Sequence, residues 1–480
     1  MLGNTSRVQP AFPIPRGQLV RNVLAAGLSS LMLKRLPGSR NLGTVLGMVK
    51  SAFLPLLSPS MQNLQHMYDG QPYPLIPIEV PVRDQWKDLF KVHLTTAQYV
   101  RTHALVSSEG KKLLNAGCGS GLETLLLAEA NPGAEIVALD FSAESVRVAE
   151  QRLRYHGFHQ VEFYVLDLLQ VADLGYTFDF ITCNDTLYLL DDPQAGLQAL
   201  RSVLDREGIL RGNLHNWYNR RDTLEVQEAL RLLGLGHQPL TEAVARTRQI
   251  MGAIRPGSWR KTQTWIPEVE QFTDDLIVNN FLLNGDKAYS ISETLALLAG
   301  AGLGLVSWVD AASWDPKQVF TEIPAFLQPV LAELSLLEQW HLCELLYPNL
   351  HRLNDFWAEH RDSSLVLPWD PQDWEGGKVH LHPLLGSNPT FHRLWHAALG
   401  KGEALVFDWL GVPSGRMQIP PDLLAWLEPL LYAPQRVADL ITDRDPETYL
   451  AHLYGLEVAL FIFLEPELEG GETFADGGEV

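Results

Sequence analysis

The chain has 480 residues, 46% of them hydrophobic and 20% charged, which is typical of a globular protein with large buried cores and about three domains. A formal net charge of −20 argues against nucleic acid as the main partner, because phosphate binding requires a basic surface. Three scattered cysteines argue against a disulfide framework and favour a reducing, cytoplasmic compartment, and no apolar run is long enough to span a membrane.

The first 83 residues predict a basic arm followed by a proline-rich connector. Residues 1–68 contain no acidic residue, seven Lys and Arg residues, and leucines at near-helical spacing. Three interpretations of the arm remain open: packing against the rest of the chain, peripheral contact with an anionic membrane or an acidic partner, and a targeting segment. Residues 70–83 contain four prolines and predict an extended connector, and residues 84–103 predict a helix.

The most informative stretch is residues 112–140, KLLNAGCGSGLETLLLAEANPGAEIVALD. Its pattern predicts a strand, a glycine loop, a helix and a second strand that ends in an acid. The glycines are Gly117, Gly119 and Gly121, and the acid is Asp140. Glycines let the backbone approach a ligand, a helix N-terminus favours an anion, and a carboxylate at a strand tip can accept hydrogen bonds from both hydroxyls of a ribose. These features predict a nucleoside site at the carboxyl ends of parallel strands.

The glycine spacing G-x-G-x-G differs from the G-x-G-x-x-G of dinucleotide sites. Together with its flanking strands and Asp140, it resembles motif I of class I S-adenosylmethionine (SAM) methyltransferases. The resemblance implies a SAM cofactor and a Rossmann-like α/β fold. That family usually has Asp or Glu where this chain has Asn115, which can still hydrogen-bond the methionine amino group but lacks the charge to pair with it.

The same order of elements continues downstream. Residues 142–155 predict a helix with Ser142 as its N-cap. Further strands are predicted at residues 161–166, 178–183 and 209–214, with a helix over residues 193–204. This alternation of strands and helices predicts a doubly wound, mostly parallel sheet. The resemblance to methyltransferases extends over residues 84–310.

The resemblance also implies where the cofactor binds. In this family an acid after the third strand, here Asp167, often binds the adenine amino group, and the segment after the fourth strand lies beside the methyl group. The segment before the first strand often closes over the cofactor, so Tyr99 or Arg101 could do so here, with plain packing as the alternative. The predicted cofactor-binding residues are Asn115, Gly117, Gly119, Gly121, Asp140, Phe141, Leu166, Asp167 and Asn184.

Methyl transfer from a sulfonium is an in-line displacement that depends mainly on orientation. A hydroxyl or amide acceptor also needs a base or an orienting group. Asp185, Tyr188 and His215 are the predicted catalytic residues, because they follow the fourth and fifth strands and should face the methyl group. Core packing is the alternative for Tyr188, and a structural role is the alternative for His215.

An insertion interrupts the expected methyltransferase pattern. Residues 84–216 and 286–317 are predicted to form the SAM-binding domain, and residues 217–285 a helical lid inserted after the fifth strand. An insertion at the carboxyl end of that strand should cover the active site and build the acceptor pocket. Its arginines could attract an acidic substrate, and a solvated helical face is the alternative.

The last third of the chain, residues 318–480, is predicted to be a separate region that binds substrate or a partner. A helical pair over residues 326–340 and 342–357 is expected to precede a mixed α/β, winged-helix-like domain. Histidines are frequent here, but their spacings match no standard zinc signature, so no metal site is predicted.

The predicted function is transfer of a methyl group from SAM to an oxygen or nitrogen acceptor on a protein or a small molecule. The alternative is a non-catalytic SAM-binding module that recruits a partner. Neither the acceptor nor the oligomeric state follows from the sequence.

Overall fold

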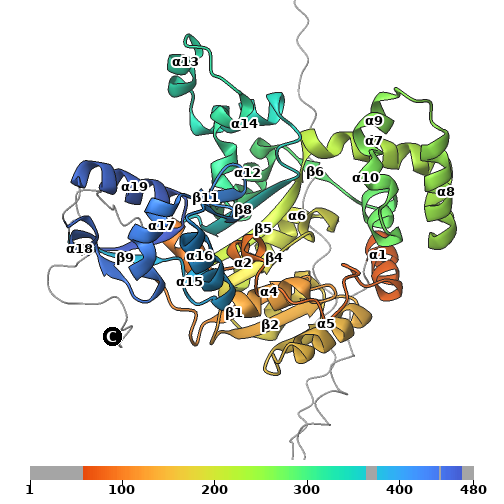
Figure 1. Ribbon diagram of the computed structural model, residues 1–480. Helices are drawn as coiled ribbons and strands as arrows, with labels where there is room; N and C mark the ends of the chain where they lie inside the picture. The colour runs from red at the N-terminus through yellow and green to blue at the C-terminus, as the bar shows by residue number, and fades with distance from the viewer. Residues whose placement is uncertain (1–57, 364–375, 443–444, 467–480) are drawn as a thin grey trace, which may run out of the picture. The chain divides into compact units, whose positions relative to one another are not determined.

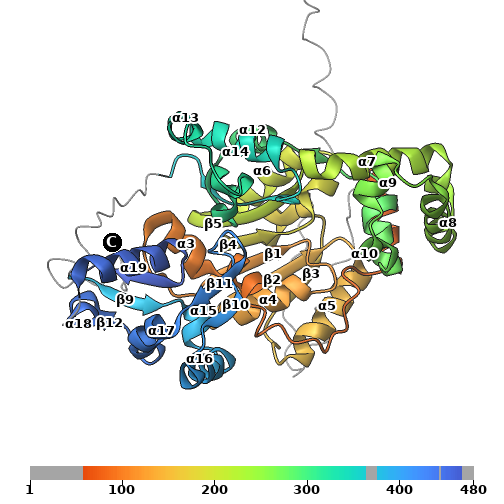
Figure 2. The ribbon, with the colours of Figure 1, turned by 45° about the horizontal axis from the view of Figure 1, so that its top comes forward.

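The structure is a computed structural model that describes residues 58–363, 376–442 and 445–466 (Figures 1 and 2). The predicted basic arm, apart from its last residues, lies outside the described residues. Within the described ranges, no helix combines the length and the apolar character that crossing a membrane requires.

A mostly parallel eight-stranded sheet forms the centre of the fold. Its order is β3-β2-β1-β4-β5-β8-β7, and β6 pairs with β5. The strands are β1 (Lys112–Ala116), β2 (Glu135–Asp140), β3 (Glu162–Val165), β4 (Phe178–Cys183), β5 (Leu204–Asn216), β6 (Ala288–Tyr289), β7 (Leu303–Trp308) and β8 (Leu353–His360). Strands β1 to β6 run parallel, whereas β8 is antiparallel to both β5 and β7. The predicted doubly wound sheet is confirmed, and its parallel strands end at one common edge.

Helices follow the strands as the sequence pattern predicts. They are α4 (Leu122–Ala130), α5 (Ala143–Tyr155), α6 (Pro193–Val203) and α12 (Ile291–Gly300). The Ser142 hydroxyl accepts a hydrogen bond from the N–H of Ser145 and caps α5, as predicted. Ser290 and Glu293 form a reciprocal capping box at the start of α12. Because helices cover the sheet, its central strands β1 and β4 are buried along nearly their whole length.

The predicted helix over residues 84–103 is broken in two, α2 (Trp86–Lys91) and α3 (Leu94–Thr102). The side chain of Asn131 fixes the break: its oxygen accepts from the N–H of Leu94 at 2.8 Å, and its nitrogen donates to the carbonyl of Val92 at 2.8 Å. A buried amide thus takes over backbone groups that a continuous helix would have paired internally.

The predicted helix over residues 342–357 is wrong in its second half. Helix α14 (Leu336–Leu346) ends before Pro348, and residues 353–360 form β8 inside the sheet. The side chains suit a helix locally, but a ladder to strands on both sides pairs the backbone of β8 more completely. A domain boundary at residue 317 therefore divides the central sheet, and α13 (Leu327–Glu333) and α14 belong to an excursion between two neighbouring strands.

The insertion between β5 and β6 is helical. It contains α7 (Trp217–Leu232), α8 (Leu240–Ala253), α9 (Trp259–Thr264), α10 (Pro267–Glu270), α11 (Asp274–Ile277) and the π-helical turn η5 (Val278–Leu282). It has a small apolar core of its own, which includes Val226, Met251, Trp265 and Phe281. Helix α1 (Pro59–Gly70) reaches the same region, because the Tyr68 hydroxyl donates to Asn279 at 3.1 Å. Figure 1 shows α1 next to α10 of the insertion.

The C-terminal part is a mixed α/β unit. Its strands are β9 (Lys378–Leu381), β10 (Leu405–Asp408), β11 (Arg416–Ile419), β12 (Gln435–Arg436) and β13 (Ile462–Glu465). They form the sheet β12-β9-β13 and the hairpin β10-β11. Its helices are α15 (Pro383–Gly386), α16 (Pro389–Lys401), α17 (Pro421–Leu427), α18 (Val437–Ile441) and α19 (Pro446–Val458). Its likeness to a winged helix stays a prediction.

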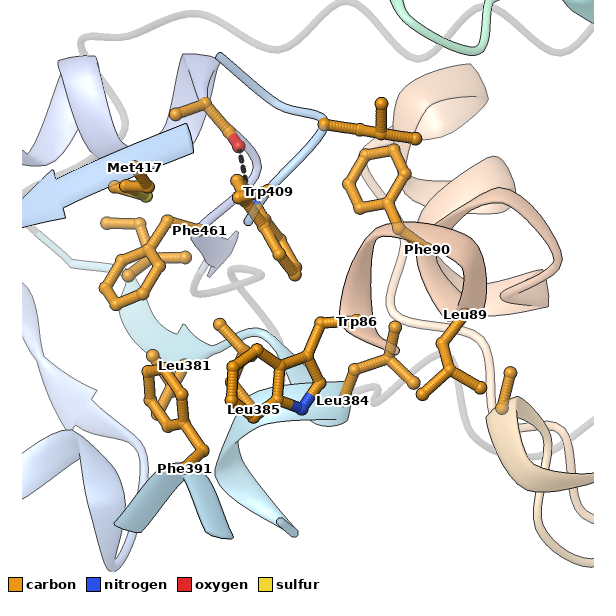
Figure 3. Packing of buried hydrophobic residues seen from close by; sticks show 14 of the residues in the cluster. Trp86, Leu89, Phe90, Leu381, Leu384, Leu385, Phe391, Trp409, Met417 and Phe461 are labelled. Atoms are coloured by element: carbon orange, nitrogen blue, oxygen red, sulfur yellow. Dashed lines mark hydrogen bonds between the residues drawn. The ribbon is translucent and has the colours of Figure 1, made fainter. Parts of the chain in front are cut away.

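Aromatic side chains join this unit to the helices before β1 (Figure 3). Trp86 of α2 contacts Phe391 and Phe407 edge to face, with ring centroids 5.6 and 5.9 Å apart. Phe90 contacts Trp409 at 5.1 Å. All five side chains are buried in one apolar cluster that also contains residues of β1 and α4. The C-terminal unit therefore shares its core with the central sheet.

Candidate active site

A cavity of about 420 Å³ lies at the carboxyl ends of β1, β2 and β4. Four parts of the chain build its walls: the glycine loop, the ends of the parallel strands, helix α1 with the connector, and the segment that enters β8. The lining residues used below are Tyr68, Tyr73, Lys91, Gly117, Gly119, Glu123, Asp140, Phe141, Leu166, Asp167, Asn184, Asp185, Arg211, Arg352 and Asp355. The cavity thus stands at the position where the sequence predicts a nucleoside site.

The glycine loop is tight enough to require glycine. Gly117 and Gly119 have φ of 78° and 50°, a left-handed region that side chains rarely adopt. A Cβ on Gly119 would come within 2.4 Å of the Tyr73 carbonyl oxygen, and one on Gly117 within 2.3 Å of the Thr186 hydroxyl. The loop is thereby pressed against both the connector and the segment after β4. Gly121, also left-handed, is the N-cap of α4 and does not line the cavity.

Asp140 points toward this loop from the tip of β2. One carboxylate oxygen accepts from the N–H of Gly119 and the other from the N–H of Ser142, both at 2.9 Å. Burial raises the pKa of Asp140 to about 6, although these two hydrogen bonds act in the opposite direction. The Asp140 carboxylate thus faces the glycine loop, as the sequence predicts.

Asn115 does not reach the cavity. Its amide nitrogen donates to the Thr182 hydroxyl at 3.0 Å, and its oxygen accepts from the Thr124 hydroxyl at 2.7 Å, so both ends are used inside the core. A carboxylate does line the cavity nearby, that of Glu123 in the first turn of α4. Burial raises the pKa of Glu123, and the adjacent charge of Arg211 opposes that rise.

Arg211 of β5 anchors a buried network at the floor of the cavity. Its guanidinium donates to both oxygens of Asp355 in β8, at 3.1 and 2.8 Å, and lies 3.3 Å from Glu123. It also donates to the Asn184 side-chain oxygen at 3.2 Å. Arg211 is not among the site residues predicted from the sequence. An arginine within a predicted strand is a usable signal, because buried charges are paired.

Asp185 follows β4 and lines the cavity in a strained backbone conformation, with φ of 47°. Its N–H donates to the Asn213 side chain at 2.9 Å, which holds the turn. Its Oδ1 is buried with no hydrogen-bond partner among the described residues, and its Oδ2 lies 3.7 Å from the Arg352 guanidinium. Burial, followed by the charge of Asp185, raises the pKa of the Tyr73 phenol at the same end of the cavity.

Tyr188 and His215 lie behind the cavity wall. Their rings stack 3.8 Å apart, and neither side chain lines the cavity. His215 Nδ1 lies 2.8 Å from Asp286, which also accepts from Arg220 at 2.9 and 2.7 Å. Burial lowers the pKa of His215, and its hydrogen bond to Asp286 only partly restores it. Of the predicted catalytic set, only Asp185 lines the cavity, and catalytic roles for Tyr188 and His215 stay predictions.

Helix α1 and the connector cover the cavity, whereas Tyr99 and Arg101, the residues expected to cover it, do not. Met61, Leu64 and Tyr68 of α1 line it. Tyr99 instead donates to Glu457 at 3.0 Å, and Arg101 to Glu359 at 2.6 Å, both away from the cavity. Residues 58–70 directly follow the apolar, basic arm, and no pattern in them distinguishes a segment that covers a cavity from the rest of the arm.

Phe141, Leu166 and Asp167 line the cavity beside Asp140, on the ends of β2 and β3. The Asp167 carboxylate also accepts from the N–H of Leu169 at 3.0 Å and caps a short helical turn. Among the described residues, no three His, Cys, Asp or Glu side chains are placed to hold a metal ion.

A family model described as "Methyltransferase domain" matches residues 107–262, a range that contains the glycine loop, Asp140 and Asp185. The chain carries a class I SAM-dependent methyltransferase domain. SAM is its cofactor, and methyl transfer is its reaction. The match begins before β1 and ends inside the insertion, so β8 and α1 lie outside it although both build the cavity of this methyltransferase.

Relatives of the methyltransferase extend the comparison. An uncharacterized protein of Synechococcus sp. is 28% identical over 347 residues, which cover 71% of this chain and 80% of the relative. The ubiquinone biosynthesis O-methyltransferase of Idiomarina loihiensis is 24% identical over 221 residues, 44% of this chain and 80% of the relative. PKMT2 from Rickettsia typhi, solved in complex with AdoHcy, has a TM-score of 0.54 at 13% identity, covering 82% of this chain and 77% of that chain, and so shares the fold.

Proposed function

We propose that the cavity holds SAM with its ribose on Asp140 and its adenine beside Phe141, Leu166 and Asp167. The observation that carries this proposal is the Asp140 carboxylate at the glycine crevice, held by the N–H groups of Gly119 and Ser142. The residues fit the cofactor: a carboxylate suits a ribose diol, and the glycines leave space that any Cβ would fill.

The methionine end of SAM would then lie between the glycine loop and the charged floor. This part of the ligand carries an ammonium and a carboxylate. Groups of both signs, Glu123 and Arg211, line the cavity there and are 3.3 Å apart. Glu123 thereby takes the part expected of Asn115, whose amide is occupied by two threonines.

Bound SAM supplies an electrophilic methyl group on a sulfonium. The protein's task is to align the acceptor, exclude water and receive a proton where the acceptor carries one. Asp185 is the group proposed for that task, because it follows β4, lines the cavity and has a carboxylate oxygen without a hydrogen-bond partner among the described residues. Helix α1, through Leu64 and Tyr68, keeps water from the reacting atoms.

The proposed acceptor is a hydroxyl or amino group on a small molecule or a protein. The I. loihiensis relative, by its name, methylates oxygen in ubiquinone biosynthesis, which supports an oxygen acceptor of small size. The insertion after β5 is proposed to act as the lid of this acceptor site. Its residue Asn279 accepts a hydrogen bond from Tyr68, which lines the cavity.

Two measurements test this function. Calorimetry with S-adenosylhomocysteine (SAH) should give a single site, which Asp140→Asn weakens and Asp173→Asn, a change at an exposed acid, leaves unchanged. Transfer of labelled methyl from SAM into a host lysate should then label an acceptor with the wild type and not with Asp185→Ala. SAH binding without any labelled product would favour the alternative, a non-catalytic SAM-binding module.

A cytoplasmic protein whose N-terminal arm contacts an anionic membrane or an acidic partner is also proposed, from charge alone. Residues 1–57 carry all seven Lys and Arg residues that precede Asp69 and no acid. Co-sedimentation with vesicles that contain phosphatidylserine tests this contact. Neutral vesicles and a chain that starts at residue 58 are the controls, and loss of binding in both distinguishes the contact from a packing role for the arm.

A further inference from the structure

We propose that Arg352 is an oxyanion-binding residue that selects methyl acceptors carrying a carboxylate or a phosphate. The inference rests on the proposed function of the cavity as the SAM and acceptor site. It concerns a residue outside the methyltransferase match and outside the catalytic and cofactor residues expected from the sequence.

Arg352 differs from the other cations that line the cavity in the described part of the chain. Lys91 is paired with Asp88 at 2.7 Å. Arg211 is held by both oxygens of Asp355 and faces Glu123. The Arg352 guanidinium has no hydrogen bond to a described residue, and its nearest carboxylate, Asp185, is 3.7 Å away. An arginine has five N–H donors, so this guanidinium has donors available for a ligand.

The backbone of Arg352 is nevertheless fixed. Its carbonyl accepts from the N–H of Asn216 at 3.0 Å, at the end of β5. The next residue, Leu353, begins β8 and pairs with His215. The sheet therefore holds the Cα of Arg352 in place while 56% of its side chain stays exposed. A fixed base with an unengaged guanidinium suits bidentate capture of a planar oxyanion.

The neighbours of Arg352 define what else the acceptor carries. Asp185 and Tyr73 line the same end of the cavity. Burial and the charge of Asp185 raise the pKa of the Tyr73 phenol, and the charge of Arg352 opposes that rise. An acceptor with an oxyanion at one end and a hydroxyl or amino group at the other satisfies both Arg352 and Asp185. A neutral acceptor leaves the guanidinium of Arg352 without a partner. An acceptor with its oxyanion at the end that receives the methyl group is repelled by the carboxylate of Asp185.

The test uses three 4-substituted phenols that differ in the group opposite the hydroxyl: 4-hydroxybenzoate, 4-hydroxyphenyl phosphate and the neutral 4-hydroxybenzyl alcohol. Their binding to the full chain saturated with SAH is measured by calorimetry. At least one oxyanion should bind the wild type at least tenfold more tightly than the neutral probe. Comparison of the carboxylate with the phosphate identifies which oxyanion the site prefers.

The variants separate recognition from folding. Arg352→Gln should remove the preference for the oxyanion, and Arg352→Lys should keep part of it, with SAH affinity changed less than twofold in both. Arg255→Gln, at an exposed arginine of the insertion that does not line the cavity, should keep the full preference. The inference is overturned if the wild type binds no oxyanion more tightly than the neutral probe, or if Arg352→Gln keeps the preference.

Failure of this inference and failure of the proposed function give different results. If SAH fails to bind the wild type, the assignment of the cavity to SAM fails by that result alone. The same probes measured without SAH then still report whether Arg352 discriminates by charge.

Discussion

A single carboxylate, Asp140, links the glycine loop to the start of α5. Because burial raises its pKa to about 6, protonation removes its charge at a pH where an exposed aspartate stays ionised. The ionised form is the one that accepts two hydrogen bonds from ribose hydroxyls. We therefore expect SAH affinity to fall as the pH drops through 6, by about tenfold at most for each further pH unit.

Calorimetry between pH 7.5 and pH 5 measures this dependence. Asp140→Asn should bind SAH more weakly at pH 7.5, by about 1–3 kcal/mol, because it loses hydrogen bonds to a charged group. Its affinity should then change little with pH. Identical pH profiles for the wild type and Asp140→Asn would show that another group titrates.

Gly119 is the glycine whose replacement should matter most. A methyl group there is strained by φ of 50° and meets the Tyr73 carbonyl, a backbone atom that cannot move without the connector. We expect Gly119→Ala to lower the free energy of unfolding by about 2–4 kcal/mol and to weaken SAH binding. Gly175→Ala, at φ of 68° with no atom within 4 Å, should show only the strain, about 1 kcal/mol. Urea denaturation of both variants measures the difference.

Among single residues, the sequence predicts those whose position follows from the neighbouring stretch of chain. The glycines, Asp140 and Asp185 are recognisable because each directly follows a predicted strand. Arg352 and Asp355 could not be found in this way, because they reach the cavity only through a strand that pairs with β5 from 138 or more residues away. Asn115 stands at the expected position, yet its amide bonds to Thr182 and Thr124, neither of which the glycine pattern reveals.

Among the elements, the insertion is tied to β5 by Asp286, which binds His215, Arg220 and Gln227. Burial would raise the pKa of Asp286, but the His215 hydrogen bond and charge and the Arg220 charge lower it to about 2. Its folded pKa is thus below the unfolded value of 3.8, so its contribution to stability is present above pH 4 and is lost as the pH falls through 2.

Removal of this carboxylate leaves Arg220 buried without its counter-charge. We expect Asp286→Ala to lower the free energy of unfolding by about 3–5 kcal/mol at pH 7. Asp274→Ala removes an exposed carboxylate of the same insertion, paired with Arg248, and should cost less than about 1 kcal/mol. Chemical denaturation compares the two, and similar losses would contradict the proposed anchoring role of Asp286.

The elements that the sequence predicts well share one property: their partners are close in the chain. Strand β4 matches its predicted range of residues 178–183, and α5 begins after its predicted cap, Ser142. The helix predicted where β8 lies is wrong, because the ladder to β5 and β7 overrides a local helical pattern. The break between α2 and α3 is missed for a similar reason. The amide that causes it, Asn131, lies about 40 residues downstream.

At the scale of the whole described chain, one apolar cluster joins the C-terminal unit to the methyltransferase domain. Trp86 of this cluster contacts Phe391 and Phe407 edge to face. We expect Trp86→Ala to lower the free energy of unfolding by about 3–5 kcal/mol, because it removes a large buried side chain. Trp259→Ala, at a tryptophan that is 62% exposed, should cost little.

The shared cluster also predicts the form of unfolding. Wild-type unfolding followed by tryptophan fluorescence and by circular dichroism should give coincident transitions, because the two parts cannot separate without exposing the cluster. Two separate transitions would show that the C-terminal unit unfolds independently. The sequence could predict a compact C-terminal mixture of helices and strands, but not this common core, since the aromatic residues that build it are about 300 residues apart.

The late position of β8 has a consequence for synthesis of the protein on the ribosome. Strands β5 and β7 are neighbours of β8 on either side, so the nascent chain carries two unpaired apolar edges until residue 360 has emerged. Such edges invite pairing with other chains, which makes this interval the one in which a chaperone is needed most. Premature termination between Trp308 and Leu353 would leave both edges unpaired, and we expect such a product to aggregate.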